Sequence, residues 1–182
     1  MRRLREFGAT DLSLTVNFRN PKLVAHDAYS FARKSPPLCK RQLHSPVEYI
    51  AADGEKAQFR KLRAILVELI RDGVSPSDVA ILSFKKNGDR IFDRTDLDIG
   101  KPLLSPAIAE REPNGFIAST VSGFKGLEAE VVILVDIPIE LGDDWSRSIF
   151  AVALTRARTK AFVIGSSDIL RDVVGKKRGE ET

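Results

Sequence analysis

The chain has 182 residues, of which 43% are hydrophobic and 30% charged, and these proportions fit one compact globular domain with a sizeable core. A single cysteine, Cys39, excludes an internal disulfide, and no signal-peptide stretch or apolar run of roughly 18 residues is present, so we expect a cytoplasmic protein without a membrane span. The net charge is +4, but residues 1–44 hold nine Lys and Arg against three Asp and Glu, which either attracts a nucleic-acid backbone or forms an ordinary solvated surface.

Short apolar runs alternate with amphipathic segments along the chain, which is typical of strands alternating with helices. This alternation predicts a mostly parallel sheet covered on both faces, within a single domain over 1–175 that is followed by a tail over 176–182. In chain order we predict a strand over 12–16, a helix over about 21–33, a strand over 47–52, a helix over about 55–72 and a strand over 79–84. The stretch 85–115 should consist mainly of loops with at most one short helix. After it we predict strands over 116–121 and 131–137, a helix over about 144–158, a strand over 161–165 and a short helix over 167–174.

Residues at the predicted helix ends match the preferences of capping positions. Asn20 can cap the first helix and Pro21 suits its first turn. Gly73 occupies the expected C-cap position after the second helix, and Asp143 with Asp144 can open the third. The first helix has one apolar face, formed by Val24, Ala28 and Phe31.

Three short segments, in a fixed order, resemble motifs of one family. Residues 14–20, Leu-Thr-Val-Asn-Phe-Arg-Asn, are similar to helicase motif IV, and residues 120–128, Thr-Val-Ser-Gly-Phe-Lys-Gly-Leu-Glu, are similar to motif V. Residues 151–158, Ala-Val-Ala-Leu-Thr-Arg-Ala-Arg, are similar to motif VI. Over about residues 12–166 the chain therefore resembles the C-terminal, second RecA-like domain of UvrD/Rep-type superfamily 1 DNA helicases. The resemblance implies an α/β, RecA-like three-layer domain with a mostly parallel sheet and helices on both faces.

In this family ATP and Mg²⁺ lie in a cleft between two RecA-like domains. The resemblance implies that Arg156 is the arginine finger, which together with Arg19 neutralises charge developing on the γ-phosphate. It also implies that Glu128 contacts the nucleotide sugar, with Gly126 and Lys125 in the same nucleotide-binding segment. Without the resemblance, Arg19 would be interpreted as a surface charge, whereas Arg156 on an otherwise apolar helix requires a partner.

Motif V also contacts single-stranded DNA in the family, and Thr120 and Ser122 are the matching positions. Many relatives have His where this chain has Ser122, so this sequence departs from the family there. Lys125 either reaches a phosphate or braces the loop. Phe124 either stacks on a base or belongs to the core, and we favour the core. Arg158 has no strong family role, and we expect it to be exposed or ion-paired.

The sequence lacks the glycine-rich loop with which a complete motor holds phosphates. The Gly-Lys pairs at 100–101 and 175–176 do not fit G-x-x-x-x-G-K-[ST]. Residues 132–136 imitate the strand and Asp of a Walker B segment, but Ile137 stands where the catalytic acid would be. We therefore expect that this chain binds no metal and does not hydrolyse ATP alone, and that its partner is an N-terminal RecA-like domain in cis or in trans.

Two further features of the sequence limit the interpretation. Motif IV follows soon after Met1, so we expect the first motor domain to lie on another polypeptide segment. The stretch 85–115 is too short for the large inserted subdomain of the longer UvrD-type enzymes, which indicates the compact form. His26 and His44 lie far from each other and from other possible ligands, so we expect no zinc site.

The leading hypothesis is the second motor domain of an ATP-dependent DNA helicase or translocase. Such a domain supplies the arginine finger and part of the single-stranded DNA contact surface, and is inactive without a first RecA-like domain. The alternative is a non-catalytic nucleic-acid- or protein-binding module derived from a helicase. A third hypothesis is a regulatory domain of a nuclease or defence complex.

Overall fold

The computed structural model covers most of the predicted elements. The strand predicted over 12–16 lies almost entirely outside the described residues, as do His44 and the tail over 176–182. The helix predicted over 167–174 is helical from 167 to 171, and its predicted end lies outside the described residues. The described residues are 16–41, 47–93, 99–110, 114–138 and 143–171.

Six strands form one sheet with the order β3-β8-β7-β4-β6-β5, and each neighbouring pair is parallel. Parallel neighbours require crossover connections, which explains why helices and loops alternate with the strands along the chain. A second, small parallel sheet pairs β1 (Val16–Asn17) with β2 (Leu38–Cys39). The strands of the main sheet are β3 (Val47–Ala51), β4 (Val79–Ser83), β5 (Leu103–Leu104), β6 (Phe116–Thr120), β7 (Ala129–Val135) and β8 (Ala157–Gly165).

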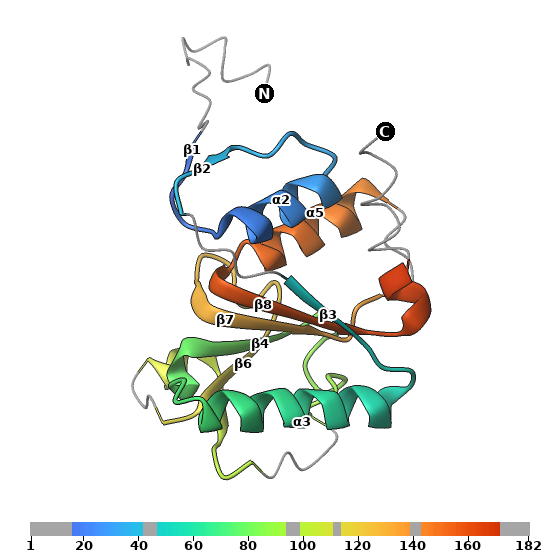
Figure 1. Cartoon of the computed structure of the whole chain (residues 1–182). Coiled ribbons are helices and arrows are strands. Elements are labelled where there is room, and N and C mark those ends of the chain that lie inside the picture. Colours follow the sequence, from blue (N-terminus) through green and yellow to red (C-terminus); the bar gives the residue numbers. More distant parts are fainter. Residues whose placement is uncertain (1–15, 42–46, 94–98, 111–113, 139–142, 172–182) are drawn as a thin grey trace, which may run out of the picture.

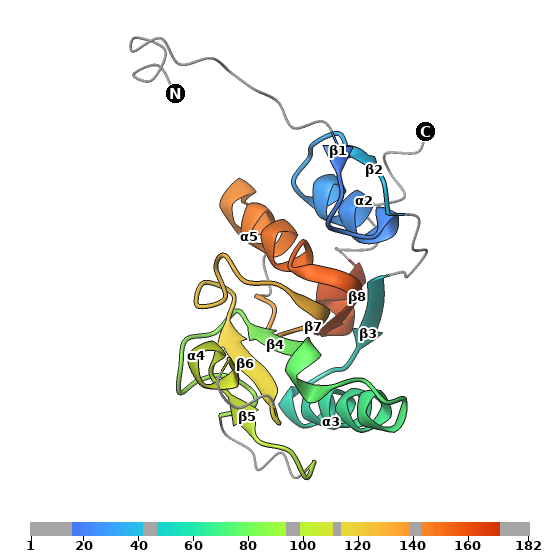
Figure 2. The same cartoon turned by 90° about the vertical axis from the view of Figure 1, so that its left-hand side faces the viewer.

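Helices cover both faces of the main sheet. Helices α2 (Lys22–Phe31) and α5 (Asp144–Leu154) lie on one face, and α3 (Glu55–Arg71) lies on the other (Figure 1). The short α4 (Pro106–Ala109) lies beside β5 and β6 (Figure 2), and a 3-10 turn (Pro76–Asp78) leads into β4. The predicted three-layer α/β fold with a mostly parallel sheet is confirmed.

Strand β4 shows why the sheet needs a layer on each side. Ala80 and Leu82 belong to the core cluster shared with α2 and α5, whereas Val79 and Ile81 belong to the cluster shared with α3. Successive side chains of a strand point to opposite faces, so an apolar run buries both. All five residues of β4 are buried.

Two helix ends have the capping residues that the sequence predicted. Gly73 has a φ of +80° just beyond the end of α3, as the C-cap prediction requires, because this backbone conformation favours glycine. Asp143 caps α5, since one of its carboxylate oxygens accepts hydrogen bonds from the backbone N–H groups of Trp145 and Ser146, both at 2.9 Å. None of the described helices combines the length and the apolar character needed to cross a membrane.

The helix predicted over 144–158 is too long, and this changes the position of Arg156. Helix α5 ends at Leu154 and β8 begins at Ala157, so Arg156 lies in the turn between them and not on a helix. Ala157 pairs with Ala129 at the start of β7, which itself begins two positions before the predicted residue 131. This long-range strand pairing prevails over the local helical pattern. The two-residue strand β5 was not predicted, because so short a segment carries no periodicity.

The prediction that Asn20 caps α2 is wrong. Pro21 occupies the N-cap position, and no side chain caps the helix. Asn20 is only 2% exposed, and its amide nitrogen donates to the carbonyl oxygens of Thr155 and Ala157 at 2.7 and 2.8 Å. Asn20 therefore joins segments that are far apart in the sequence, and a local capping pattern cannot reveal such a role.

Candidate functional site

The predicted site residues lie at two opposite edges of the sheet. Glu128 directly precedes β7 and Arg156 directly precedes β8, so both lie at the edge where the parallel strands begin. Thr120 is the last residue of β6 and lies at the edge where the strands end. The structure thus brings Arg19, Glu128 and Arg156 together and leaves the predicted DNA-contact residues at the other edge.

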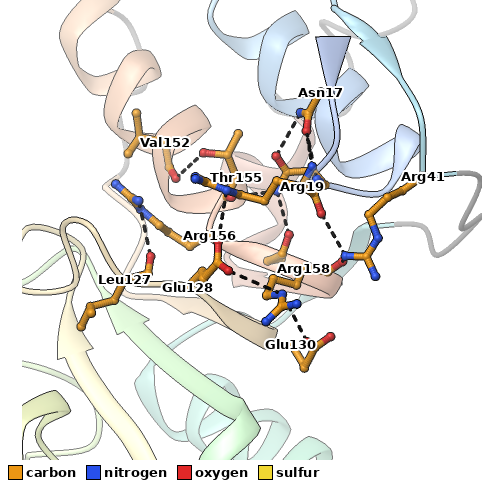
Figure 3. Close-up of polar contacts among 12 residues, drawn as sticks. Asn17, Arg19, Arg41, Leu127, Glu128, Glu130, Val152, Thr155, Arg156 and Arg158 are labelled. Carbon is orange, nitrogen blue, oxygen red and sulfur yellow. Dashed lines mark hydrogen bonds and ion pairs between the residues drawn. The ribbon is translucent and has the colours of Figure 1, made fainter. Parts of the chain in front are cut away.

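Arg19 and Glu128 form an ion pair at the first of these edges (Figure 3). The Nε atom of Arg19 lies 3.1 Å from Oε2 of Glu128, and the two side chains are 56% and 38% exposed. Arg158 Nε lies 3.6 Å from Oε1 of Glu128 and 3.3 Å from Oε1 of Glu130, so Arg158 is ion-paired as expected. Ion pairs this exposed contribute about 0–1 kcal/mol each, and a competing anion or hydroxyl group can replace them at little cost.

Arg156 lies beside these ion pairs without joining them. Its Nη1 atom donates a long hydrogen bond of 3.4 Å to the carbonyl oxygen of Leu127, and no carboxylate of the described residues forms an ion pair with it. Burial lowers the pKa of Arg156, the nearby charge of Arg19 lowers it further, and Glu128 acts in the opposite direction. A guanidinium still keeps its proton at neutral pH. A partly buried cation beside a second cation favours binding of an anion.

Two asparagines fix the backbone around both arginines. Asn17 Oδ1 accepts from the N–H groups of Arg19 at 2.8 Å and Asn20 at 3.1 Å, and Asn17 Nδ2 donates to Asn20 Oδ1 at 3.1 Å. Asn20 in turn donates to the carbonyl oxygens on either side of Arg156, those of Thr155 and the residue that follows Arg156. The loop that carries Arg19 and the turn that carries Arg156 are therefore one hydrogen-bonded unit (Figure 3).

Arg41 completes this unit, and sequence reasoning missed it. Its Nη1 atom donates to the carbonyl oxygen of Arg19 at 3.0 Å and to that of Arg158 at 2.8 Å. The side chain thus braces the backbone of two arginines. The two asparagines could have been selected from the sequence, because Asn17 and Asn20 flank Arg19 within motif IV. Arg41 could not, because it lies outside every motif.

The segment between β6 and β7 links the two edges and is anchored in the core. Phe124 is 1% exposed and belongs to the cluster under α2 and α5, which confirms the favoured interpretation of this residue. Thr120 Oγ1 accepts from the N–H group of Gly123 at 2.9 Å, and Gly126 has a φ of +87°. Lys125 is exposed on this segment. Phe124 therefore fixes this segment to the core between the two edges.

A cavity of about 440 Å³ lies at the edge where the strands end. It contains the predicted residues Thr120 and Ser122, and also two lysines and an exposed tryptophan that sequence reasoning missed. Trp145 is 73% exposed at the start of α5. The sequence feature that could have indicated this cavity is the pair of lysines directly after the strand predicted over 79–84. The residues that line this cavity include Lys85, Lys86, Thr120, Ser122 and Trp145.

Asp136, the acid of the Walker B-like run, is occupied by partners within the chain. It is 7% exposed, has a φ of +54°, and accepts hydrogen bonds from Ser83 Oγ at 2.6 Å and the N–H group of Ile91 at 2.9 Å. Lys85 Nζ lies 3.2 Å from its other oxygen. The carboxylate therefore holds the ends of β4 and β7 together. In the described part of the chain no three potential metal-ligating side chains gather, and His26 is exposed on α2.

Comparison with known proteins identifies the fold and leaves the family open. No protein family's profile matches the chain, and no curated protein matches its sequence. A solved structure that is similar is the C-terminal domain of a possible DNA helicase from Lactobacillus plantarum WCFS1, with a TM-score of 0.61 and 15% sequence identity. The match covers 85% of this chain and 93% of that domain. The chain therefore shares its fold with that domain over most of its length.

Proposed function

We propose that this chain is the second motor domain of an ATP-dependent DNA helicase or translocase and is inactive without a first RecA-like domain. The observation that carries the proposal is Arg156, a partly buried cation beside Arg19 that no carboxylate of the described residues neutralises. An open edge with an unsatisfied positive charge fits an anionic ligand supplied from outside the domain.

The two arginines and the carboxylate fit the parts of a nucleoside triphosphate. ATP would supply the γ-phosphoryl group, and Arg156, with Arg19 beside it, would neutralise the charge that develops there. Glu128 would accept hydrogen bonds from the sugar hydroxyls, with Lys125 and Gly126 in the same nucleotide-binding segment. Mg²⁺ would be held by the other domain, because the cluster offers it an excess of cations.

The surface around the arginines supports a protein partner at this edge. Phe18 is 69% exposed and precedes Arg19 in the sequence, and Leu127 is 43% exposed and accepts from Arg156 through its carbonyl oxygen. Val152 is 45% exposed, and its carbonyl oxygen accepts from the hydroxyl of Thr155, the residue before Arg156. Exposed apolar side chains mixed with arginines are typical of interface cores. The proposed occupant is the first RecA-like domain, which would hold the phosphates that this chain lacks the loop to bind.

The opposite edge supports contact with single-stranded DNA. Lys86 and Lys85 supply positive charge, Trp145 supplies an exposed ring for stacking, and Thr120 and Ser122 supply hydroxyls in the same cavity. Single-strand binding sites combine such cationic tracks with aromatic platforms. In the proposed motor, the segment between β6 and β7 would couple this edge to the nucleotide edge.

The test is to add the first RecA-like domain in trans and measure DNA-stimulated phosphate release. Arg156→Ala should lower the rate by about 10³–10⁵, the usual contribution of an arginine finger. Arg158→Ala is the matched control, because that arginine is already paired with Glu128 and Glu130, and its loss should change the rate only a few-fold. Turnover that survives Arg156→Ala would contradict the assignment.

A non-catalytic nucleic-acid-binding module is the second candidate. The observation in its favour is that this chain itself supplies Lys86 and Trp145 to one cavity. This candidate predicts single-strand binding with no ATP hydrolysis under any pairing. The trans experiment separates the two candidates when binding and hydrolysis are measured on the same samples.

A further inference from the structure

Helix α3 carries a row of exposed positive charges. Between Glu55 and Glu68 the helix contains four exposed cations and no acidic residue. The buried side of the helix packs on the sheet through four apolar residues, Leu62, Ile65, Leu66 and Leu69. The four cations, which form the basic face of α3, are Lys56, Arg60, Lys61 and Arg63.

The helical spacing groups these side chains into a stripe. Residues three or four positions apart share one side of a helix, so Lys56, Arg60 and Arg63 lie in a row. Lys61 lies beside that row. At a rise of about 1.5 Å per residue, the row is roughly 10 Å long. Duplex DNA places one phosphate of each strand about every 3.4 Å along its axis, so the row matches about three phosphates of one strand.

Most of the basic face is not neutralised from within the domain. No carboxylate of the described residues forms an ion pair with Lys56, Arg60 or Lys61. Further along the helix, in contrast, Arg71 lies 3.6 Å from Asp72. Exposed cations that are close together repel one another and attract a polyanion. The basic face therefore suits a partner with several negative charges in a row.

The composition of this face favours a DNA backbone as that partner. The cores of protein interfaces are enriched in aromatic residues and depleted in lysine. Every residue of α3 is described, and among its large hydrophobic side chains only Val67 is exposed, at 45%. Single-strand sites need exposed rings for stacking, whereas Phe59 is half-buried. Contacts with the phosphates of a duplex need cations and no exposed ring.

The basic face begins at the edge of the sheet where the single-strand contact is proposed. Helix α3 follows β3 and α5 follows β7, so both helices begin where the parallel strands end (Figure 1). The cavity that contains Lys86 and Trp145 lies at this edge, by the start of α5. A hollow of about 250 Å³ lies at the start of α3 and is lined by Lys56, Phe59 and Arg60 with Glu55.

We propose that the basic face of α3 binds the sugar-phosphate backbone of double-stranded DNA, independently of base sequence. The choice of DNA over another polyanion rests on the proposed function, which itself needs only a single strand at the other cavity. The domain would then hold a single strand beside α5 and a duplex along α3. Backbone contacts of this kind position a protein on DNA without reading its bases.

The experiment measures binding of a fluorescent blunt-ended DNA duplex to the pure chain across a salt series. Combining Lys56→Gln, Arg60→Gln and Lys61→Gln removes the three cations that have no ion pair with the described residues. The slope of the logarithm of affinity against the logarithm of salt concentration should fall by about 2.7, because each lost phosphate contact accounts for about 0.9. The affinity at ~50 mM salt should fall at least about tenfold, and Lys56→Gln alone should lower the slope by about 0.9.

The matched control removes the same charge from the other helical layer. It combines Lys22→Gln, Lys34→Gln and Lys40→Gln, three exposed positions on α2 and in the segment that follows it. The control should change the slope by less than about 0.5, because it removes no phosphate contact. Thermal unfolding checks the fold of both variants, and since all six side chains are exposed the melting temperatures should stay within about 2 °C of the unmodified chain.

Four results would overturn the proposal. The unmodified chain might bind no duplex, or the two triple variants might lose affinity equally, which would indicate a general effect of net charge. Loss of duplex binding in Lys86→Ala alone would place the duplex in the other cavity. Poly-L-glutamate that binds the α3 surface as tightly as the duplex does at the same salt concentration would indicate an acidic protein partner.

Failure of the single-strand site gives a different pattern. If Lys86→Ala leaves the binding of an oligothymidylate unchanged while the triple substitution in α3 weakens duplex binding, the proposed single-strand edge is wrong and the duplex surface stands. If Lys86→Ala weakens oligothymidylate binding and the triple substitution in α3 leaves duplex binding unchanged, the duplex surface is wrong and the single-strand edge stands.

Discussion

The amide nitrogen of Asn20 holds the two carbonyl groups on either side of Arg156, at 2.7 Å to Thr155 and 2.8 Å to Ala157. Asn20 is buried and one residue away from Arg19. The relative position of the two arginines therefore depends in part on a side chain that bridges segments more than a hundred residues apart in the sequence.

Replacing Asn20 by alanine should lower the free energy of unfolding by about 1–3 kcal/mol, because a buried and a partly buried carbonyl oxygen lose their donor. Chemical denaturation of the two proteins measures the difference. Asn87→Ala, which removes an exposed amide, should change the stability by less than about 0.5 kcal/mol. Equal effects of the two substitutions would show that the Asn20 bridge contributes nothing.

The sequence predicted those elements whose pattern is local. The buried strand over 79–84 and the amphipathic helix over 55–72 carry their periodicity within themselves, and the structure has β4 and α3 at those places. The end of α5 was predicted wrongly because it depends on β7, which pairs with Ala157, and on Asn20. Strand pairing and side-chain bridges over more than a hundred residues leave no periodic trace.

The candidate site likewise contains some residues that the sequence identified and others that only the fold brings together. Motif resemblance selected Arg19, Glu128 and Arg156, and the structure brings them together. It did not select Arg41 or Lys86, because neither falls within a motif and only the fold brings them to the two edges. Residues that support a site through the backbone are the least visible in a single sequence.

Glu128→Gln should raise the affinity of the isolated chain for inorganic tripolyphosphate. The neutral amide releases Arg19 from its 3.1 Å ion pair and leaves both arginines to the anion. A surface ion pair contributes about 0.2–1 kcal/mol, so the gain should be about 1.4- to fivefold. NMR titration of the backbone amides measures it.

Arg158→Ala provides a control for the Glu128 experiment, because this substitution should not raise the affinity for tripolyphosphate. Without Arg158, the Glu128 carboxylate keeps its ion pair with Arg19, so tripolyphosphate binding should weaken or stay unchanged. The same sign for both substitutions would mean that the release of Arg19 does not set the affinity.

Ser83 at the end of β4 and Ser119, one residue before the end of β6, should differ in their effect on stability. Ser83→Ala removes a buried hydroxyl that serves Asp136 and the Lys85 backbone, and should cost about 1–3 kcal/mol. Ser119→Ala removes a buried hydroxyl without a partner among the described residues and should cost nothing. Calorimetric unfolding of both variants makes the comparison, and a large loss for Ser119→Ala would reveal a structural role for that hydroxyl.

Acid should remove the stabilising effect of Asp93. The side-chain hydrogen bonds from Arg90 hold the pKa of Asp93 below its ordinary value, against the effect of burial. A carboxylate with a lowered pKa stabilises the fold above its unfolded-state pKa, and this stabilisation is lost as the pH falls through the folded-state pKa. Asp93→Asn should therefore be less stable than the unmodified chain at pH ~7, and the gap should narrow as the pH falls below the ordinary Asp pKa of ~3.9 and close once the pH has fallen through the lowered folded-state pKa. A gap that is constant across this range would contradict the assignment, and denaturant midpoints measured at each pH provide the data.

Single-strand binding by the isolated chain should be weak and should fall with salt, because one edge of one domain contacts few phosphates. Removing one lysine–phosphate interaction should reduce the slope of the logarithm of affinity against the logarithm of salt concentration by about 0.7 for single strands. Lys86→Ala should show this full reduction, since Lys86 forms no ion pair with the described residues. Lys85→Ala should show less, because Asp136 at 3.2 Å already compensates the charge of Lys85. Fluorescence anisotropy across a salt series distinguishes the two lysines, and an equal reduction for both would mean that the Lys85–Asp136 pair opens when DNA binds.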